Sequence, residues 1–279
     1  MTPAPPGRVR RGLVETRAGA VEYCELGSGP ALLALHPTPG SCLWYADVAP
    51  LLAGERRLLA MTTMGYGRSE RPHPPYTTVG EYAAAAVAFL DAMGVERAGV
   101  VGSHTGSVLA VEVAAGWPER VEALVLGEPF NWNTPARREV LTRQHRYVPP
   151  APDGSHLVEL WRRQGPGRPG VDLREFARRF VDFLVVNAPE AAYGELGWEG
   201  AGPHAITRYE MWDRAAAIEA PTLVIHGSGS DLGRSHERFL ATIARSRGLR
   251  PPSHGRFSPR EAPVLWADEV TGFLRDPGV

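Results

Sequence analysis

Residues that could do acid–base chemistry gather at four points along the 279-residue sequence. In the middle, an apolar stretch leads into Gly-Ser-His-Thr-Gly at residues 102–106, with His104 at the centre of a tight turn before a predicted helix. An imidazole exchanges protons near neutral pH, so a histidine held at such a turn suits proton transfer. The other points are His36-Pro37-Thr38-Pro39-Gly40, the glycine turn at 65–69, and His226-Gly227, which is followed by Asp231 and the segment 255–263.

Alternating strands and helices must position these four points. Strands are predicted at the short apolar runs 31–36, 57–62, 99–103, 121–127 and 221–227, and such runs are typical of strands buried on both faces. Helices are predicted at 44–52, 78–93, 105–115, 237–245 and 262–274. This alternation predicts an α/β fold with a mostly parallel central sheet and helices on both faces. An antiparallel hairpin at 9–16 and 20–26 precedes it.

The alternation stops at residue 131, where the sequence becomes rich in Arg, Pro and aromatic residues. We predict that residues 131–215 form a helical cap inserted between two parts of the core, residues 1–130 and 216–279. Within the insertion, helical stretches at 158–163 and 172–186 flank a loop at 165–170.

The charge balance excludes several classes of function. All 30 basic residues are arginine, and with 31 acidic residues the net charge is -1. A chain without lysine cannot form a lysine Schiff base, hold pyridoxal phosphate covalently or supply the lysine of a phosphate-binding P-loop. The small net charge argues against broad nucleic-acid or anionic-membrane binding. The expected partner is therefore a small-molecule substrate, and the sequence leaves the oligomeric state open.

The cysteines and the N-terminal residues indicate the cellular compartment in which we expect the protein. Cys24 and Cys42 are too few for a disulfide framework, and no metal-ligand spacing or cofactor motif stands out. The first residues lack the apolar region of a signal peptide, and the longest apolar run, at 83–90, is too short to span a bilayer. We expect a cytoplasmic protein that uses neither metal nor cofactor.

In their order and strand–loop context, the four points resemble the α/β-hydrolase fold superfamily over nearly the whole chain. This resemblance implies a nucleophile elbow at residues 102–106, whose central side chain projects over the sheet. The central residue is His104, where the family carries Ser, Cys or Asp. The family's acid follows one of two strands, so Asp231 and Glu128 are alternative partners for an imidazole.

The same resemblance predicts two further parts of the site. Alignment of the segment 255–263 places Arg256 where the family has its catalytic histidine, with His254 two residues upstream. Arginine is no base near neutral pH, but it binds anionic oxygens well. The oxyanion-hole N–H groups map to Thr38 and Thr105. Residues that could line a substrate pocket are His36, Trp44, Trp132, Tyr147, Tyr209 and Trp212.

A degenerate triad of this kind retains an anion-stabilising pocket and loses the usual nucleophile and base. We therefore expect a cofactor-free, non-hydrolytic enzyme of natural-product biosynthesis. It would perform carbon–carbon bond formation, cyclisation or lyase-type chemistry on an aromatic or polycyclic secondary metabolite. Two alternatives stay open. One is a hydrolase of an ester or epoxide in which His104 activates water, and the other is a ligand-binding member without catalysis.

Overall fold

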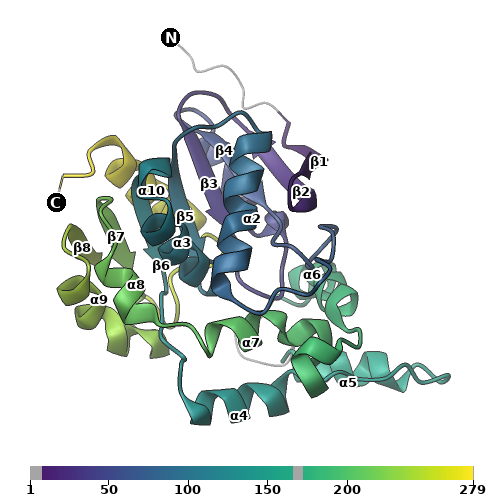
Figure 1. Ribbon diagram of the computed structural model, residues 1–279. Coiled ribbons are helices and arrows are strands. Elements are labelled where there is room, and N and C mark those ends of the chain that lie inside the picture. Colours follow the sequence, from purple (N-terminus) through teal and green to yellow (C-terminus); the bar gives the residue numbers. More distant parts are fainter. Residues whose placement is uncertain (1–7, 166–171, 279) are drawn as a thin grey trace.

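An eight-stranded sheet forms the centre of the computed structural model, which describes residues 8–165 and 172–278 (Figure 1). The strand order is β1-β2-β4-β3-β5-β6-β7-β8. The strands are β1 (Arg10–Thr16), β2 (Gly19–Leu26), β3 (Ala31–Leu35), β4 (Arg57–Met61), β5 (Ala98–Ser103), β6 (Val121–Gly127), β7 (Thr222–Ile225) and β8 (Ser246–Leu249). β2 pairs antiparallel with β1 and β4, and the remaining pairs are parallel. The mostly parallel sheet with an N-terminal hairpin is confirmed.

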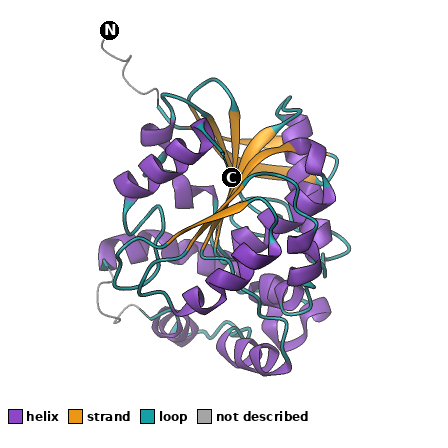
Figure 2. Cartoon of the chain, turned by 90° about the vertical axis from the view of Figure 1, so that its left-hand side faces the viewer, coloured by secondary structure: helices purple, strands orange, loops and turns teal. Residues whose placement is uncertain are grey.

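Helices cover both faces of this sheet (Figure 2). Leu33 and Leu35 of β3 pack into the core with α2 (Val79–Ala92) and α3 (Thr105–Gly116). Leu32 and Ala34 point the other way, into the core with α1 (Ala49–Leu52) and α10 (Pro263–Arg275). Successive strand side chains face opposite sides, so a strand covered on both faces needs an unbroken apolar run. This is why the buried strands are visible in the sequence.

One predicted helix differs from the structure, and one strand of the structure was not predicted. In place of one helix at 44–52 there is a 3₁₀ turn at Cys42–Tyr45 and then the short α1. Pro50, near the start of α1, has no N–H with which to continue a preceding helix. The edge strand β8 was not predicted, because Ser-Arg-Gly-Leu at 246–249 is partly exposed and carries no apolar pattern.

The segment between β6 and β7 lies below the sheet in Figure 1. It contains α4 (Pro135–Gln144), α5 (Ser155–Arg163), α6 (Leu173–Val186), 3₁₀ turns over Ala191–Gly200, α7 (Ala201–Ile206) and α8 (Met211–Ala216). Another 3₁₀ turn, Asp231–Ser235, and the helix α9 (His236–Thr242) follow β7. A separate cap domain with boundaries at 131 and 215 stays a prediction. Most of the loop predicted at 165–170, and the start of the chain, lie outside the described residues.

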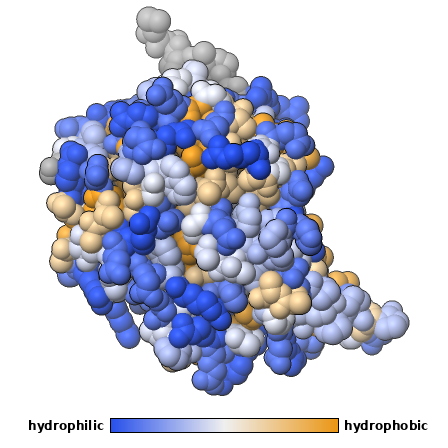
Figure 3. All heavy atoms as spheres, viewed as in Figure 1, coloured by the Kyte–Doolittle hydropathy of each residue, from blue (hydrophilic) through white to orange (hydrophobic). Residues whose placement is uncertain are grey.

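The visible surface is mostly polar. On the face shown in Figure 3, hydrophilic residues cover most of the area and hydrophobic residues are scattered among them. In the described part of the chain, every helix is too short or too polar to cross a membrane.

Candidate active site

The turn between β5 and α3 holds His104 in a strained backbone conformation. His104 has φ 52° and ψ −115°, and Glu128 is the other non-glycine residue with positive φ in the described ranges. The glycines on either side are required by close backbone packing. A β-carbon on Gly102 would lie 2.3 Å from the carbonyl oxygen of Gly106, and one on Gly106 would lie 2.0 Å from that of Leu35. This frame presents the His104 side chain beyond the end of the sheet.

The His104 imidazole lies among aromatic rings and has no hydrogen-bond partner. Its ring centroid is 4.7 Å from that of Phe130 and 5.4 Å from that of Trp132. Within the described residues, neither ring nitrogen has a hydrogen bond. Burial and the positive charge of Arg256 both lower the pKa of His104 well below its usual value. The ring is therefore neutral near pH 7, and it keeps a lone pair free to accept a proton.

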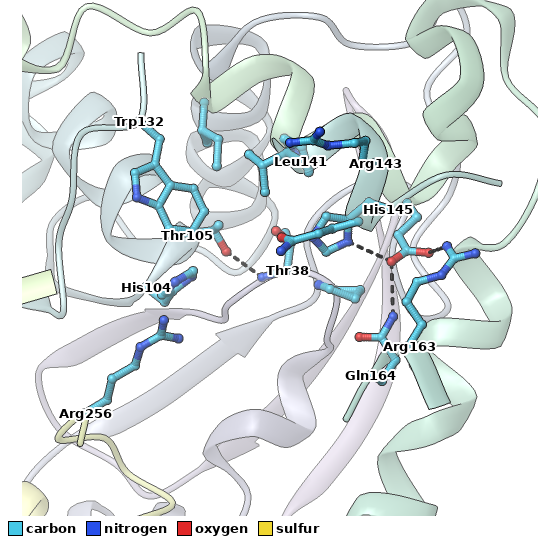
Figure 4. Close-up of a pocket in the computed structure, with 15 residues that line it drawn as sticks. Thr38, His104, Thr105, Trp132, Leu141, Arg143, His145, Arg163, Gln164 and Arg256 are labelled. Atoms are coloured by element: carbon cyan, nitrogen blue, oxygen red, sulfur yellow. Dashed lines mark hydrogen bonds and ion pairs between the residues drawn. The ribbon is translucent and has the colours of Figure 1, made fainter. Parts of the chain in front are cut away.

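Two cavities, of about 350 and 270 Å³, share His104 in their linings. Figure 4 shows the first of them. Both are lined by Thr38, Pro39, His104, His145, Gln164 and Arg256. The first extends along α4 to Leu141, and the second reaches Trp44 and Glu128. Their size suits a small molecule.

Glu128 holds the loop that carries Arg256. Its buried carboxylate accepts hydrogen bonds from the Gly227 N–H at 2.8 Å, the Phe257 N–H at 2.7 Å and the Ser230 hydroxyl. These contacts connect the ends of β6 and β7 to the loop after β8. The structure thus gives Glu128 a positioning role toward the Arg256 loop and shows no hydrogen bond from it to His104.

Asp231, the other candidate acid, lies at the surface. Its side chain is 73% exposed and forms an ion pair with Arg256 at 3.7 Å. It therefore neutralises part of the Arg256 charge and leaves the His104 ring without a carboxylate partner. His254 is exposed and does not line either cavity.

The two threonines predicted for the oxyanion hole are joined to each other. The backbone N–H of Thr38 donates a hydrogen bond to Oγ1 of Thr105, and both residues line the first cavity. The Thr38 donor is therefore already engaged. The Thr105 hydroxyl, as the acceptor in this bond, keeps its own hydrogen for an oxygen in the cavity.

Two of the six residues predicted to bind substrate line the cavities, and four do not. Trp132 lines the first cavity and Trp44 the second. Tyr147 lies on a separate groove, Tyr209 donates to Glu112 at 2.8 Å, and Trp212 packs on Phe239 with a centroid distance of 4.9 Å. His36 is buried, receives the Thr63 N–H at 3.0 Å and pairs its other nitrogen with the Pro37 carbonyl. Tyr209, Trp212 and His36 thus have structural partners away from the cavities, and Tyr147 faces a different groove.

The sequence analysis missed a polar cluster on the cavity. His145 Nδ1 lies 2.8 Å from Oε1 of Glu199, and Gln164 Nε2 donates to the same oxygen at 3.2 Å. These residues lie far apart in the sequence and belong to no spacing pattern, so no sequence signal links them. In the described ranges, no group of His, Cys, Asp and Glu is placed to hold a metal ion.

Comparison with known proteins identifies the family. A model of the alpha/beta hydrolase fold family matches residues 30–236. The chain belongs to this family. Among solved structures, the enol-lactonase from Burkholderia xenovorans LB400 superposes with a TM-score of 0.72 at 19% identity, over 95% of this chain and 100% of that one. At that identity the likeness supports the alpha/beta hydrolase fold alone.

Curated relatives resemble parts of this alpha/beta hydrolase. Haloalkane dehalogenase 2 of Mycobacterium tuberculosis is 30% identical over 118 residues, which are 42% of this chain and 41% of the relative. The 2-hydroxymuconate semialdehyde hydrolase of Pseudomonas sp. strain CF600 is 38% identical over 103 residues, which are 36% of each chain. The chain thus spans less than half the length of these relatives.

The relatives correct the expected chemistry. They carry the names of hydrolytic enzymes, among them epoxide hydrolase and semialdehyde hydrolase, so the expectation of a non-hydrolytic cyclase or lyase in natural-product biosynthesis is wrong. The error lay in treating the lost serine-type nucleophile as the loss of hydrolysis. A neutral imidazole can also activate water by accepting its proton.

Proposed function

We propose that this protein is a hydrolase of small carboxylic esters in which His104 activates water. The observation that carries the proposal is the His104 ring itself, which is neutral, has no hydrogen-bond partner among the described residues and lines the cavity at the tip of the elbow. The hydrolase names of the relatives support this chemistry. In this proposal the catalytic triad is degenerate, because position 104 offers a base and no hydroxyl.

Ser103, the hydroxyl that precedes His104, lines the second cavity but is a poor substitute nucleophile. It is buried, and its Oγ receives a hydrogen bond from the Tyr45 hydroxyl at 3.0 Å. Among the described residues, no histidine forms a hydrogen bond with its hydroxyl. Water is therefore the nucleophile that the site can activate, and the Thr105 hydroxyl would stabilise the oxyanion that forms.

Arg256 gives the site a preference for substrates that carry a negative charge. Its guanidinium lies on both cavities, and its one ion pair in the described ranges is the long, exposed contact with Asp231. A cation at this place binds a carboxylate on the substrate or a developing oxyanion. We therefore expect esters that carry a second, anionic group to be better substrates than neutral esters of equal size.

The test is steady-state hydrolysis of a panel of p-nitrophenyl and alkyl esters, with one epoxide included. His104→Ala is expected to lower kcat by about 10²–10⁴-fold, and oxygen from labelled water should appear in the acid product. His254→Ala, which changes an exposed histidine away from the cavities, is the matched control. Unchanged kcat in His104→Ala would remove the proposed role, and saturable binding without turnover of any substrate would favour a ligand-binding member.

A further inference from the structure

A second imidazole reaches the cavity from the segment below the sheet. His145 follows α4, and its Nδ1 lies 2.8 Å from Oε1 of Glu199 (Figure 4). Glu199 is 1% exposed. Gln164 Nε2 donates to Oε1 at 3.2 Å, and Arg163 Nη1 lies 3.8 Å from Oε2. The end of α4, the end of α5 and the 3₁₀ turns thus converge on one buried carboxylate.

The contact with Glu199 fixes which nitrogen of His145 can exchange a proton. A carboxylate accepts hydrogen bonds, so Nδ1 carries the hydrogen that points to Glu199. Nε2 is left for the cavity, and it has no hydrogen bond to any residue that the structure describes. His145 lines both cavities, as His104 does, and the two rings lie on either side of Thr38 in Figure 4.

The two histidines have opposite electrostatic surroundings. His104 is buried near the cation Arg256, and both the burial and the cation disfavour a positive charge on its ring. His145 instead has a buried carboxylate, Glu199, as its hydrogen-bond partner. The cavity is thus lined by one imidazole beside a cation and one beside an anion, and this arrangement suits a base and an acid that work together.

We infer that His145, held by Glu199, is the general acid that protonates the leaving oxygen in the hydrolysis proposed above, on which this inference rests. Water gives a proton to His104 as its oxygen bonds to the carbonyl carbon. For this step His145 starts as the imidazolium, with a hydrogen on Nε2 as well as on Nδ1. The ester C–O bond then breaks, its electron pair stays on the leaving oxygen, and that oxygen takes the Nε2 proton, which leaves His145 neutral with its hydrogen on Nδ1. Transfer through solvent from His104 to His145 restores the starting state, so ester and water give acid and alcohol.

Esters whose leaving groups differ in basicity test the role of His145 as a general acid. A p-nitrophenolate departs without a proton, whereas an alkoxide needs one. We expect His145→Gln to lower kcat/KM for an alkyl ester by about 10²-fold or more, and to change it far less for the p-nitrophenyl ester of the same acid. Glu199→Gln should show the same selective loss. The ratio of the two rates is measured within each variant, so a partly unfolded sample does not alter it.

Two controls separate acid catalysis from a structural role. Thr242→Val removes a neutral hydrogen bond within α9, away from both cavities, and should leave the rate ratio at the wild-type value. His254→Gln, at the surface, should also leave it unchanged. A wild-type ratio in both His145→Gln and Glu199→Gln would overturn the inference while wild-type hydrolysis preserves the proposed function. Hydrolysis of neither ester by the wild type would overturn both.

Discussion

His104 is held neutral by its surroundings, and this sets the pH range over which it can accept a proton. Because its pKa lies well below the usual value, the free base persists at pH values where an ordinary histidine is already protonated. We expect kcat/KM for a p-nitrophenyl ester to stay level as the pH falls through 6.5 and to decline only at lower pH. An acid limb at or above pH 6.5 in the rate profile would contradict a buried base.

Arg256 contributes to that low pKa through its charge. Arg256→Gln removes the charge and leaves the burial, so the acid limb should move upward without reaching the value of an exposed histidine. The same pH–rate profile checks it, and an unshifted limb would show that burial alone determines the pKa. Arg250→Gln, which removes a cation away from the cavities, is the matched control.

In the proposed hydrolysis, the Thr105 hydroxyl is the side-chain donor to the oxyanion. The Thr38 N–H that it accepts polarises the hydroxyl and strengthens its donation to a second oxygen. Thr105→Val keeps the shape and removes the donor, so kcat should fall by about 10²-fold with little change in KM. Thr242→Val on α9 is the control, because its hydroxyl bonds a carbonyl in its own helix. A raised kcat in Thr105→Val would mean that the hydroxyl blocks the Thr38 donor.

The sequence predicted those site residues that belong to a local motif. His104, Thr38, Thr105 and Arg256 follow strand ends in a known order, and all four line the cavity. His145 and Glu199 come from helices and turns whose packing depends on tertiary contacts, so no local pattern marks them. The sequence also does not show which of two acidic residues is buried. Both Glu128 and Asp231 follow strands, and only Glu128 is buried.

At the scale of elements, the β5–α3 turn depends on glycine for steric reasons. Gly106→Ala would place a β-carbon 2.0 Å from the Leu35 carbonyl oxygen, and we expect it to lower the free energy of unfolding by about 3 kcal/mol. In Gly272→Ala, on α10, the new carbon meets nothing within 4 Å, so this variant should gain about 0.5–1 kcal/mol. Urea unfolding measures both. Equal stabilities would show that the backbone around the turn can relax.

Strands that are buried on both faces of the sheet could be predicted from the sequence. The unbroken apolar runs of β3, β5 and β7 and the Thr78–Glu81 capping box of α2 marked their elements directly. β8 is an edge strand that pairs with β7 alone, so pairing and not hydrophobicity defines it.

At the scale of the whole molecule, buried histidines couple stability to pH. Burial lowers the pKa of His36 and of His226 to about 4. Between that value and about 6.5 the unfolded chain binds protons that the folded chain does not, so stability falls as the pH falls. Each histidine should remove about 2 kcal/mol between pH 7 and pH 5.

Urea unfolding at both pH values tests this coupling. His36→Gln should lose its share of the pH dependence, and His254→Gln, exposed in the fold, should retain all of it. A pH dependence that is the same in His36→Gln as in the wild type would exclude His36 as a source.

The positive φ at His104 has an evolutionary consequence. The glycines on either side, and not the residue between them, determine the path of the chain through the elbow. Side chains of different chemistry can therefore occupy position 104 while the sheet and α3 keep their places. A single nucleotide change turns a histidine codon into one for aspartate, which would replace a base by a carboxylate nucleophile on the same backbone. A single substitution at position 104 could thus change the class of reaction, whereas the fold would stay the same.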